Sequence, residues 1–371
     1  MKEKKIKVLM VGPDRQGRGG IASVVNEYYE AGIEDQIQLR YIATMKDGSK
    51  LKKVLIAARG LIEFCVCMPT YEIVHVHMAS RASFYRKSIF VRLAYKSGKK
   101  IVIHVHGAQF QQFVEQECNA RQQAQVRHIF EMADLVLCLS KEWQEYFEGI
   151  CSPDKIRVLH NAVPMPQETE QSKNLEVPPI SGVPKILHYR NKPNDNILFL
   201  GRVGERKGMT DLLQIMPKLI ADNPKVKLYV GGDGEIRRYE KLCNELNIGE
   251  SVQFLGWLSK EEKAKYLKLC SIFVLPSYNE GMPVSLLEAM SYGCAVVASN
   301  VGGIPQVMNH QVNGIMIEPG DQVALKQSLQ ELLQNPELKT QMSEEAVRTI
   351  SEEFSIEKNI AKLVGMYREL A

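Results

Sequence analysis

Residues 272–290 read Ile-Phe-Val-Leu-Pro-Ser-Tyr-Asn-Glu-Gly-Met-Pro-Val-Ser-Leu-Leu-Glu-Ala-Met. The apolar run 272–275 has the length of a buried strand, and Pro276 ends it because proline has no backbone N–H to donate to a sheet. From Pro283 onward, apolar residues recur at helical spacing. The stretch therefore predicts a strand, a polar turn and a helix. In open parallel sheets, turns of this kind at the carboxyl ends of strands bind ligands.

Two glutamates stand in this turn and helix. Glu280 lies at the mouth of the turn, and Glu288 follows eight residues later. At about 100° per residue, this spacing places both carboxylates toward one side of a helix. The neighbours of Glu288 are apolar, so we expect it to be half buried and to need a partner. Two carboxylates that bind hydroxyls, with a helix start that favours a phosphate, suit a nucleotide sugar.

The same region resembles a known enzyme family. The motifs that carry the resemblance are Ser277–Pro283, Glu288, Gly293–Ala298 and Val301–Pro305. They are similar to the core signature of the retaining glycosyltransferases of family 4. The resemblance implies an α/β protein with the GT-B fold, in which two Rossmann-like parallel-sheet domains face an interdomain cleft. It covers nearly all of the second half of the chain and, more loosely, parts of the first.

The length of 371 residues is sufficient for two domains. We expect an N-terminal acceptor-binding domain over residues 1–175 and a C-terminal donor-binding domain over 190–354. A proline-rich, aperiodic stretch, 164–195, is typical of a linker. The resemblance implies that the last helix, 355–371, packs back on the first domain.

The composition limits the class of protein and its cellular compartment. Apolar residues make up 45% and charged residues 24%, as in ordinary globular proteins. No apolar run approaches the length of a membrane span, and the lysine-rich start leads directly into a strand. The eight cysteines are scattered without zinc-ligand spacing. We therefore expect a cytoplasmic protein with reduced thiols.

The first hundred residues are basic. They carry 19 Lys and Arg against 9 Asp and Glu, whereas the whole chain has a net charge of only +4. Residues 50–68 and 81–100 predict two basic helices that suit an anionic membrane surface, such as the inner face of the plasma membrane. The alternative is an ordinary solvated helix face. No nucleic-acid partner is predicted.

Three features of the first domain are candidates for the site. Residues 17–22 match the fingerprint G-x-G-x-x-A, which would favour a nicotinamide oxidoreductase, but no acidic residue follows at the required distance. In the resembled family, a glycine pair like Gly19-Gly20 approaches the donor phosphate and the acceptor. His106 resembles the histidine that contacts the donor sugar, and Asn161 belongs to the looser match. His75, His77 and His104 are interpreted as satisfied core histidines rather than metal ligands.

The second domain supplies the cations. Strand 196–200 delivers Gly201 and Arg202, and Lys207 precedes the helix 210–221. A planar guanidinium and an ammonium group suit a diphosphate. The resemblance implies this role for Arg202 and Lys207, with Arg206 as a competitor. The predicted catalytic residues are Arg202, Lys207, Glu280 and His106, and the predicted donor-binding residues are Gly19, Gly20, Asn161, Gly201, Trp257, Leu258, Gly281, Met282, Pro283, Val284 and Glu288.

The resemblance implies a glycosyltransferase that acts with retention. No Asp-x-Asp motif is present, so we expect no metal and no cofactor besides a UDP- or GDP-linked sugar donor. The expected acceptor is a saccharide or a polyprenyl-diphosphate-linked saccharide in surface polysaccharide synthesis. Two alternatives stay open, a sugar-nucleotide 2-epimerase of the same architecture and a non-catalytic peripheral membrane module.

Overall fold

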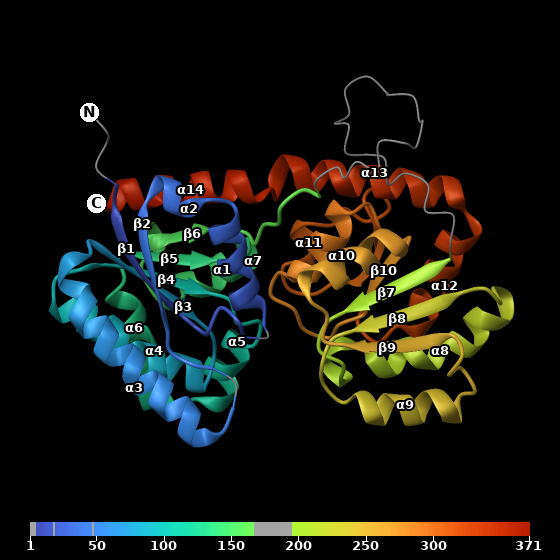
Figure 1. The fold of residues 1–371 in the computed structure, drawn as a ribbon, viewed down its shortest axis with the longest axis horizontal. Helices are drawn as coiled ribbons and strands as arrows, with labels where there is room; N and C mark the ends of the chain where they lie inside the picture. The colour runs from blue at the N-terminus through green and yellow to red at the C-terminus, as the bar shows by residue number, and fades with distance from the viewer. Residues whose placement is uncertain (1–4, 18, 47, 167–194) are drawn as a thin grey trace. The chain divides into compact units, whose positions relative to one another are not determined.

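The computed structural model describes residues 5–17, 19–46, 48–166 and 195–371 (Figure 1). The chain divides into two compact units. The first contains Met1–Ala162 and Ile356–Ala371, and the second contains Val163–Ser355. Most of the predicted linker 164–195, and with it the predicted domain limits at residues 175 and 190, lies outside the described residues.

The first unit is built on a six-stranded parallel sheet in the order β2-β1-β3-β4-β5-β6. Its strands are β1 (Lys7–Gly12), β2 (Gln38–Ala43), β3 (Ile73–Met78), β4 (Lys100–Val105), β5 (Leu135–Cys138) and β6 (Ile156–Val158). Its helices are α1 (Gly20–Glu30), α2 (Ile33–Gln36), α3 (Lys50–Cys67), α4 (Ala82–Lys96), α5 (Phe110–Gln112), α6 (Ala120–Glu131), α7 (Lys141–Glu148) and α14 (Ile356–Leu370).

The two faces of this sheet differ in chemistry. Side chains alternate along a strand, so Val74, Val76 and Met78 of β3 lie on one face, in the apolar core, where Phe64 of α3 packs edge-to-face on Phe90 of α4. The opposite face of β3 and β4 carries histidines. Helix α14 reaches this face, because the hydroxyl of its Tyr367 lies 2.5 Å from Nδ1 of His75.

The second unit contains another six-stranded parallel sheet, in the order β12-β11-β10-β7-β8-β9. Its strands are β7 (Asn196–Leu200), β8 (Lys227–Gly231), β9 (Val252–Gly256), β10 (Ile272–Leu275), β11 (Ala295–Ser299) and β12 (Ile315–Ile317). Its helices are α8 (Met209–Asp222), α9 (Ile236–Glu245), α10 (Lys260–Leu269), α11 (Val284–Ser291), α12 (Gln322–Gln334) and α13 (Pro336–Glu353). Within the described residues, no helix combines the length and hydropathy needed to cross a lipid bilayer.

The strand order of the second sheet reverses at β7. This strand pairs with β8 on one side and with β10 on the other. Consecutive connections leave the sheet in opposite directions at such a point, so the loops after the two strands border a crevice at the carboxyl edge. The loops that follow β7 and β10 carry the cations and Glu280 that the sequence singles out.

A glycine brings these two loops into contact. Gly208 has a φ of 68°, and a Cβ atom there would lie 1.9 Å from the carbonyl oxygen of Pro276, directly after β10. Only glycine fits such an approach of two backbones. The short turn Glu205–Lys207 and the start of α8 therefore rest on the end of β10.

We predict that Gly208→Ala lowers the free energy of unfolding of the second unit by about 3 kcal/mol or more, from the left-handed backbone and the clash together. Gly256→Ala is the matched control, because Gly256 has a φ of 69° but nothing within 4 Å of an added Cβ atom. That variant should lose only about 1 kcal/mol. Urea unfolding measures both, and equal losses would contradict the proposed contact.

Candidate functional site

The loops after β7 and β10 are held together by backbone and side-chain hydrogen bonds. The amide of Tyr278 donates to the carbonyl oxygen of Arg206 at 2.9 Å. In return, Nη1 of Arg206 donates to the carbonyl oxygen of Asn279 at 2.6 Å. Arg206 is thus engaged in joining the loops, which argues against it as the free cation that competes with Lys207.

A buried ion pair lies where these loops meet. Nζ of Lys207 donates to Oε1 of Glu280, and the two residues are 9% and 7% exposed. A Cβ atom on Gly201 would lie 3.5 Å from Cε of Lys207, so the strand end lies directly beside this side chain. The structure therefore brings together Gly201, Lys207 and Glu280, three of the predicted site residues.

The chain from Glu280 into α11 presents backbone donors. Gly281, Met282 and Pro283 are buried, and Val284 is half buried at the first position of the helix. Within residues 195–371, the amides of Gly281, Val284 and Ser285 have no hydrogen-bond acceptor. Amides at a helix start attract anions.

Two glycines from the next loop pack beneath this segment. The amide of Gly303 donates to the carbonyl oxygen of Gly281 at 2.5 Å, and a Cβ atom on Gly302 would lie 1.9 Å from the carbonyl oxygen of Glu280. The Gly-Gly pair of the sequence motif thus has a packing role. It fixes the backbone of the loop at Glu280 and Gly281.

The expectation that Glu280 and Glu288 share one side of a helix is wrong. Helix α11 begins at Val284, so Glu280 belongs to the preceding loop and the angle per residue of a helix does not apply to it. Each carboxylate has its own lysine instead. Glu288 is 9% exposed and accepts a hydrogen bond from Nζ of Lys263, a residue of α10.

Lys263 is a site residue that sequence reasoning missed. It lies in the sequence Lys-Glu-Glu-Lys-Ala-Lys, where nothing distinguishes it from the other lysines. The half-buried carboxylate expected at Glu288 required a partner, and this was the available signal. It did not identify which cation would supply the partner.

The remaining predicted residues of the second unit are Arg202, Trp257 and Leu258. Arg202 is exposed and, among the described residues, makes no hydrogen bond or ion pair. Trp257, directly after β9, is 48% exposed. Leu258 packs beside Gly231, where an added Cβ atom would lie 2.8 Å from its Cδ1. Arg202 is therefore a guanidinium available to an incoming anion.

The candidates of the first unit lie at three strand ends of its sheet. Gly19 and Gly20, at the start of α1, are exposed, and nothing lies within 4 Å of a Cβ atom added to either. Asn161, after β6, is buried. His106 follows β4, with its Nε2 2.8 Å from Nδ1 of His77. Burial, reinforced by His104, holds the pKa of His106 well below its usual range, so the imidazole is neutral.

The predicted basic helices differ from expectation. Lys87 of α4 is not on the surface but buried, where its Nζ donates to the carbonyl oxygen of His77, and burial lowers its pKa to about 7. Arg81 is paired with Glu117. The exposed side of α3 is mainly apolar, with side chains 60–72% exposed at Leu51, Val54, Leu55, Ile62 and Val66.

The fold and the site together define a class of protein, the GT-B glycosyltransferases. The structure matches sucrose-phosphate synthase from Thermosynechococcus elongatus with a TM-score of 0.79 at 19% identity, over 99% of both chains. It matches Anabaena HepE, solved in complex with UDP, with a TM-score of 0.74 at 15% identity, over 98% of this chain and 100% of HepE. The predicted GT-B fold is confirmed.

Family models match both halves of the chain. The model described as Glycosyltransferase Family 4 matches residues 18–165, and the model described as Glycosyl transferases group 1 matches residues 188–349. The chain therefore belongs to the glycosyltransferases of family 4, and the resemblance to that family seen in the sequence is confirmed.

Curated relatives match over part of their length. An uncharacterized glycosyltransferase of Methanocaldococcus jannaschii is 28% identical over 244 residues, which cover 63% of this chain and 59% of the relative. A lipopolysaccharide core biosynthesis glycosyltransferase of Rhizobium meliloti is 29% identical over 162 residues, 43% of this chain and 46% of the relative. The chain thus spans roughly half the length of these two relatives.

We predict that Lys207→Met destabilises the second unit by about 3 kcal/mol, because it leaves the carboxylate of Glu280 buried without its cation. The double variant Lys207→Met/Glu280→Gln should recover most of this loss, since no buried charge is then unpaired. Urea unfolding of the wild type, both single variants and the double variant gives the coupling energy. Strictly additive losses would show that the two groups do not stabilise each other.

Proposed function

We propose that the protein transfers a sugar from a nucleotide diphosphate to a saccharide acceptor, with retention of anomeric configuration and without a metal ion at the reacting diphosphate. One observation carries the proposal. At the point where the strand order reverses, the carboxyl edge of the second sheet carries a buried lysine–carboxylate pair, together with an arginine and helix-start amides that have no partner within the described residues.

These groups have complementary roles toward a leaving diphosphate. Negative charge grows on the diphosphate as the anomeric C–O bond breaks, and donors aimed at that charge lower the barrier. Lys207 has three N–H donors and gives one to Glu280, which leaves two for phosphate oxygens. Arg202 offers a planar fork, and the amides of Val284 and Ser285 add neutral donors.

The two carboxylates are suited to bind hydroxyl groups. Glu280 and Glu288 each use Oε1 for a lysine, and within the described residues their Oε2 atoms have no partner. We assign Oε2 of Glu280 to hydroxyls of the transferred sugar and Oε2 of Glu288 to the ribose. The paired lysines fix both carboxylates in orientation.

Retention is compatible with a mechanism that needs no protein nucleophile. In a front-face displacement, the acceptor oxygen attacks the anomeric carbon from the side of the departing diphosphate, and a phosphate oxygen takes the acceptor's proton. The bond to the diphosphate breaks as the new glycosidic bond forms. The cations and amides at the switch point stabilise the departing charge, which is the main requirement of this route.

We assign a UDP-linked donor and a lipid-linked saccharide acceptor. The structural neighbour HepE was solved with UDP, and a relative acts in lipopolysaccharide core synthesis, which supports this pair of substrates. The functional test is incubation with UDP-sugars and lipid-linked saccharides. Release of UDP that depends on acceptor, with an α-linked product from an α-linked donor, supports the proposal. Release of UDP without any glycosylated product would contradict it.

A surface of the first unit favours a membrane-bound acceptor. The exposed residues Leu51, Val54, Leu55, Ile62 and Val66 follow one stripe of α3, and helical spacing places the exposed cation Arg59 beside it. Contiguous exposed apolar residues on a soluble fold mark an interaction surface, and the adjoining cation suits anionic headgroups. We propose that α3 lies in the interface of an anionic membrane, where a lipid-linked acceptor resides.

We predict that Arg202→Ala reduces kcat/KM by about a hundredfold or more while leaving stability unchanged, because Arg202 is exposed and makes no hydrogen bond or ion pair with any described residue. Arg206→Ala is the matched control, since it removes a loop contact but no phosphate ligand. It should reduce kcat/KM less than about tenfold. A larger loss in Arg206→Ala than in Arg202→Ala would reverse the assignment of the two arginines.

We predict that the double variant Leu55→Glu/Ile62→Glu binds anionic phosphatidylglycerol vesicles at least about tenfold more weakly than the wild type, measured by co-sedimentation. Both side chains are exposed, so the fold should be retained. Val323→Glu, at a 67% exposed position of α12, is the control and should bind as the wild type does. Equal binding by all three proteins would exclude α3 as the membrane surface.

A further inference from the structure

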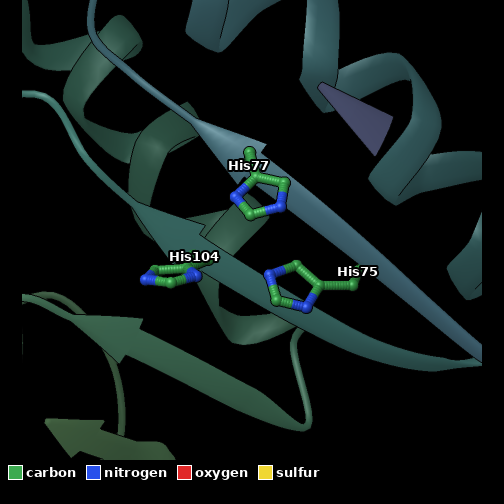
Figure 2. Close-up of side chains that lie close together, drawn as sticks. All are labelled: His75, His77 and His104. Atoms are coloured by element: carbon green, nitrogen blue, oxygen red, sulfur yellow. The ribbon is translucent and has the colours of Figure 1, made fainter. Parts of the chain in front are cut away.

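Three histidines gather on one face of the first sheet (Figure 2). His77 of β3 and His104 of β4 are direct neighbours in the parallel register, and His75 lies two residues before His77, on the same face. The ring centroids of His75 and His77 are 4.6 Å apart, and each is 5.4 Å from that of His104. One nitrogen from each ring lies within 4.8 Å of the other two.

The hydrogen bonding of these rings is incomplete. The three residues are at most 1% exposed. Nε2 of His75, Nε2 of His77 and both ring nitrogens of His104 have no partner among the described residues. The interpretation of the sequence, that these are satisfied core histidines, is therefore wrong. Buried imidazole nitrogens normally find a partner, so this group of atoms requires an explanation.

The nitrogens that do have partners follow the pattern of metal ligands. Nδ1 of His75 is bonded to the hydroxyl of Tyr367, and Nδ1 of His77 to Nε2 of His106. A histidine that binds a metal usually donates its other N–H to a neighbour, which fixes the ring and its tautomer. In both residues the nitrogen left over is Nε2, with its lone pair available.

We propose that His75, His77 and His104 bind one divalent transition-metal ion, with zinc as the first candidate. Three imidazoles are a known ligand set for zinc, and a solvent molecule takes the fourth tetrahedral position. Zinc–nitrogen bonds of about 2.0–2.1 Å place ligand nitrogens roughly 3.3 Å apart, so the rings close by small side-chain rotations. The trio contains no carboxylate, which disfavours calcium and magnesium.

The surroundings keep the ligands in the required state. Burial, reinforced by neighbouring histidines, holds the pKa values of His75 and His77 well below their usual range, and burial lowers that of His104 to about 3. The rings are thus neutral, as metal ligands must be.

The metal would link the sheet to two other parts of the first unit. With Nε2 of His77 on the metal, its Nδ1 carries a proton and donates to Nε2 of His106. The remaining proton of His106 is then fixed on its Nδ1. In the same way Nδ1 of His75 donates to Tyr367, which ties α14 to β3. The metal would therefore orient His106. A role for this orientation in binding the donor sugar rests on the proposed function.

The experiment uses the full chain, purified without a metal-affinity tag, incubated with zinc and dialysed, with metal content measured by mass spectrometry. The wild type should retain about one equivalent and His104→Gln less than about a tenth of that. His128→Gln removes an exposed histidine of α6 and should retain the wild-type amount. Circular dichroism confirms that each variant is folded.

Two results would overturn the proposal. One is a wild type that retains less than about a tenth of an equivalent, and the other is a folded His104→Gln that retains as much as the wild type. If His104→Gln does not fold, cobalt titration of the wild type decides. A tetrahedral cobalt spectrum that saturates at about one equivalent supports the site, and absence of that spectrum removes it. Neither the metal content nor the cobalt spectrum depends on glycosyl transfer. A failure of the metal-site proposal therefore leaves the proposed function unaffected.

Discussion

The buried pair of Lys207 and Glu280 is the interaction on which the second unit's site depends. Neither charge is tolerable at this depth without the other, so the loops after β7 and β10 must keep their mutual geometry. The left-handed turn at Gly208 and the backbone contact at Gly302 meet this requirement from two sides. The result is a rigid support for residues that are themselves exposed, above all Arg202.

This support explains why glycines and prolines recur in the motifs. Gly208, Gly302 and Gly303 each lie where an added Cβ atom would collide with a backbone carbonyl of a neighbouring loop. Pro276 ends β10, and Pro283 precedes the first residue of α11, so the intervening turn has a fixed length. Backbone contacts of this kind position amide donors more exactly than side-chain contacts would, because amides have no rotamers to lose.

Much of this fold could be predicted from the sequence, but the pairing of charges could not. An apolar run such as 272–275 indicates a buried parallel strand because both faces of such a strand are covered. Periodicity does not say which cation meets which carboxylate. Lys263 and Glu288 are 25 residues apart, and Lys207 and Glu280 are 73 apart. Such contacts depend on strand order, which a single sequence does not state.

In the first unit, the sequence did not predict which side chains face solvent. A run of lysines and arginines indicated a basic surface, yet Lys87 points inward toward a strand carbonyl and the outward stripe of α3 is apolar. The histidines of β3 and β4 alternate with apolar residues, which indicates burial but not the absence of partners for their nitrogens. Composition predicts how many charges a region has, whereas the packing of each helix decides where they face.

The central claim is that the start of α11 receives the diphosphate of a nucleotide. Hydrogen exchange of the amides of Gly281, Val284 and Ser285, measured with and without saturating UDP, tests it most directly, since these amides have no acceptor within the described residues. We expect UDP to slow their exchange by at least about tenfold. Unchanged exchange at these amides, with UDP bound, would contradict it.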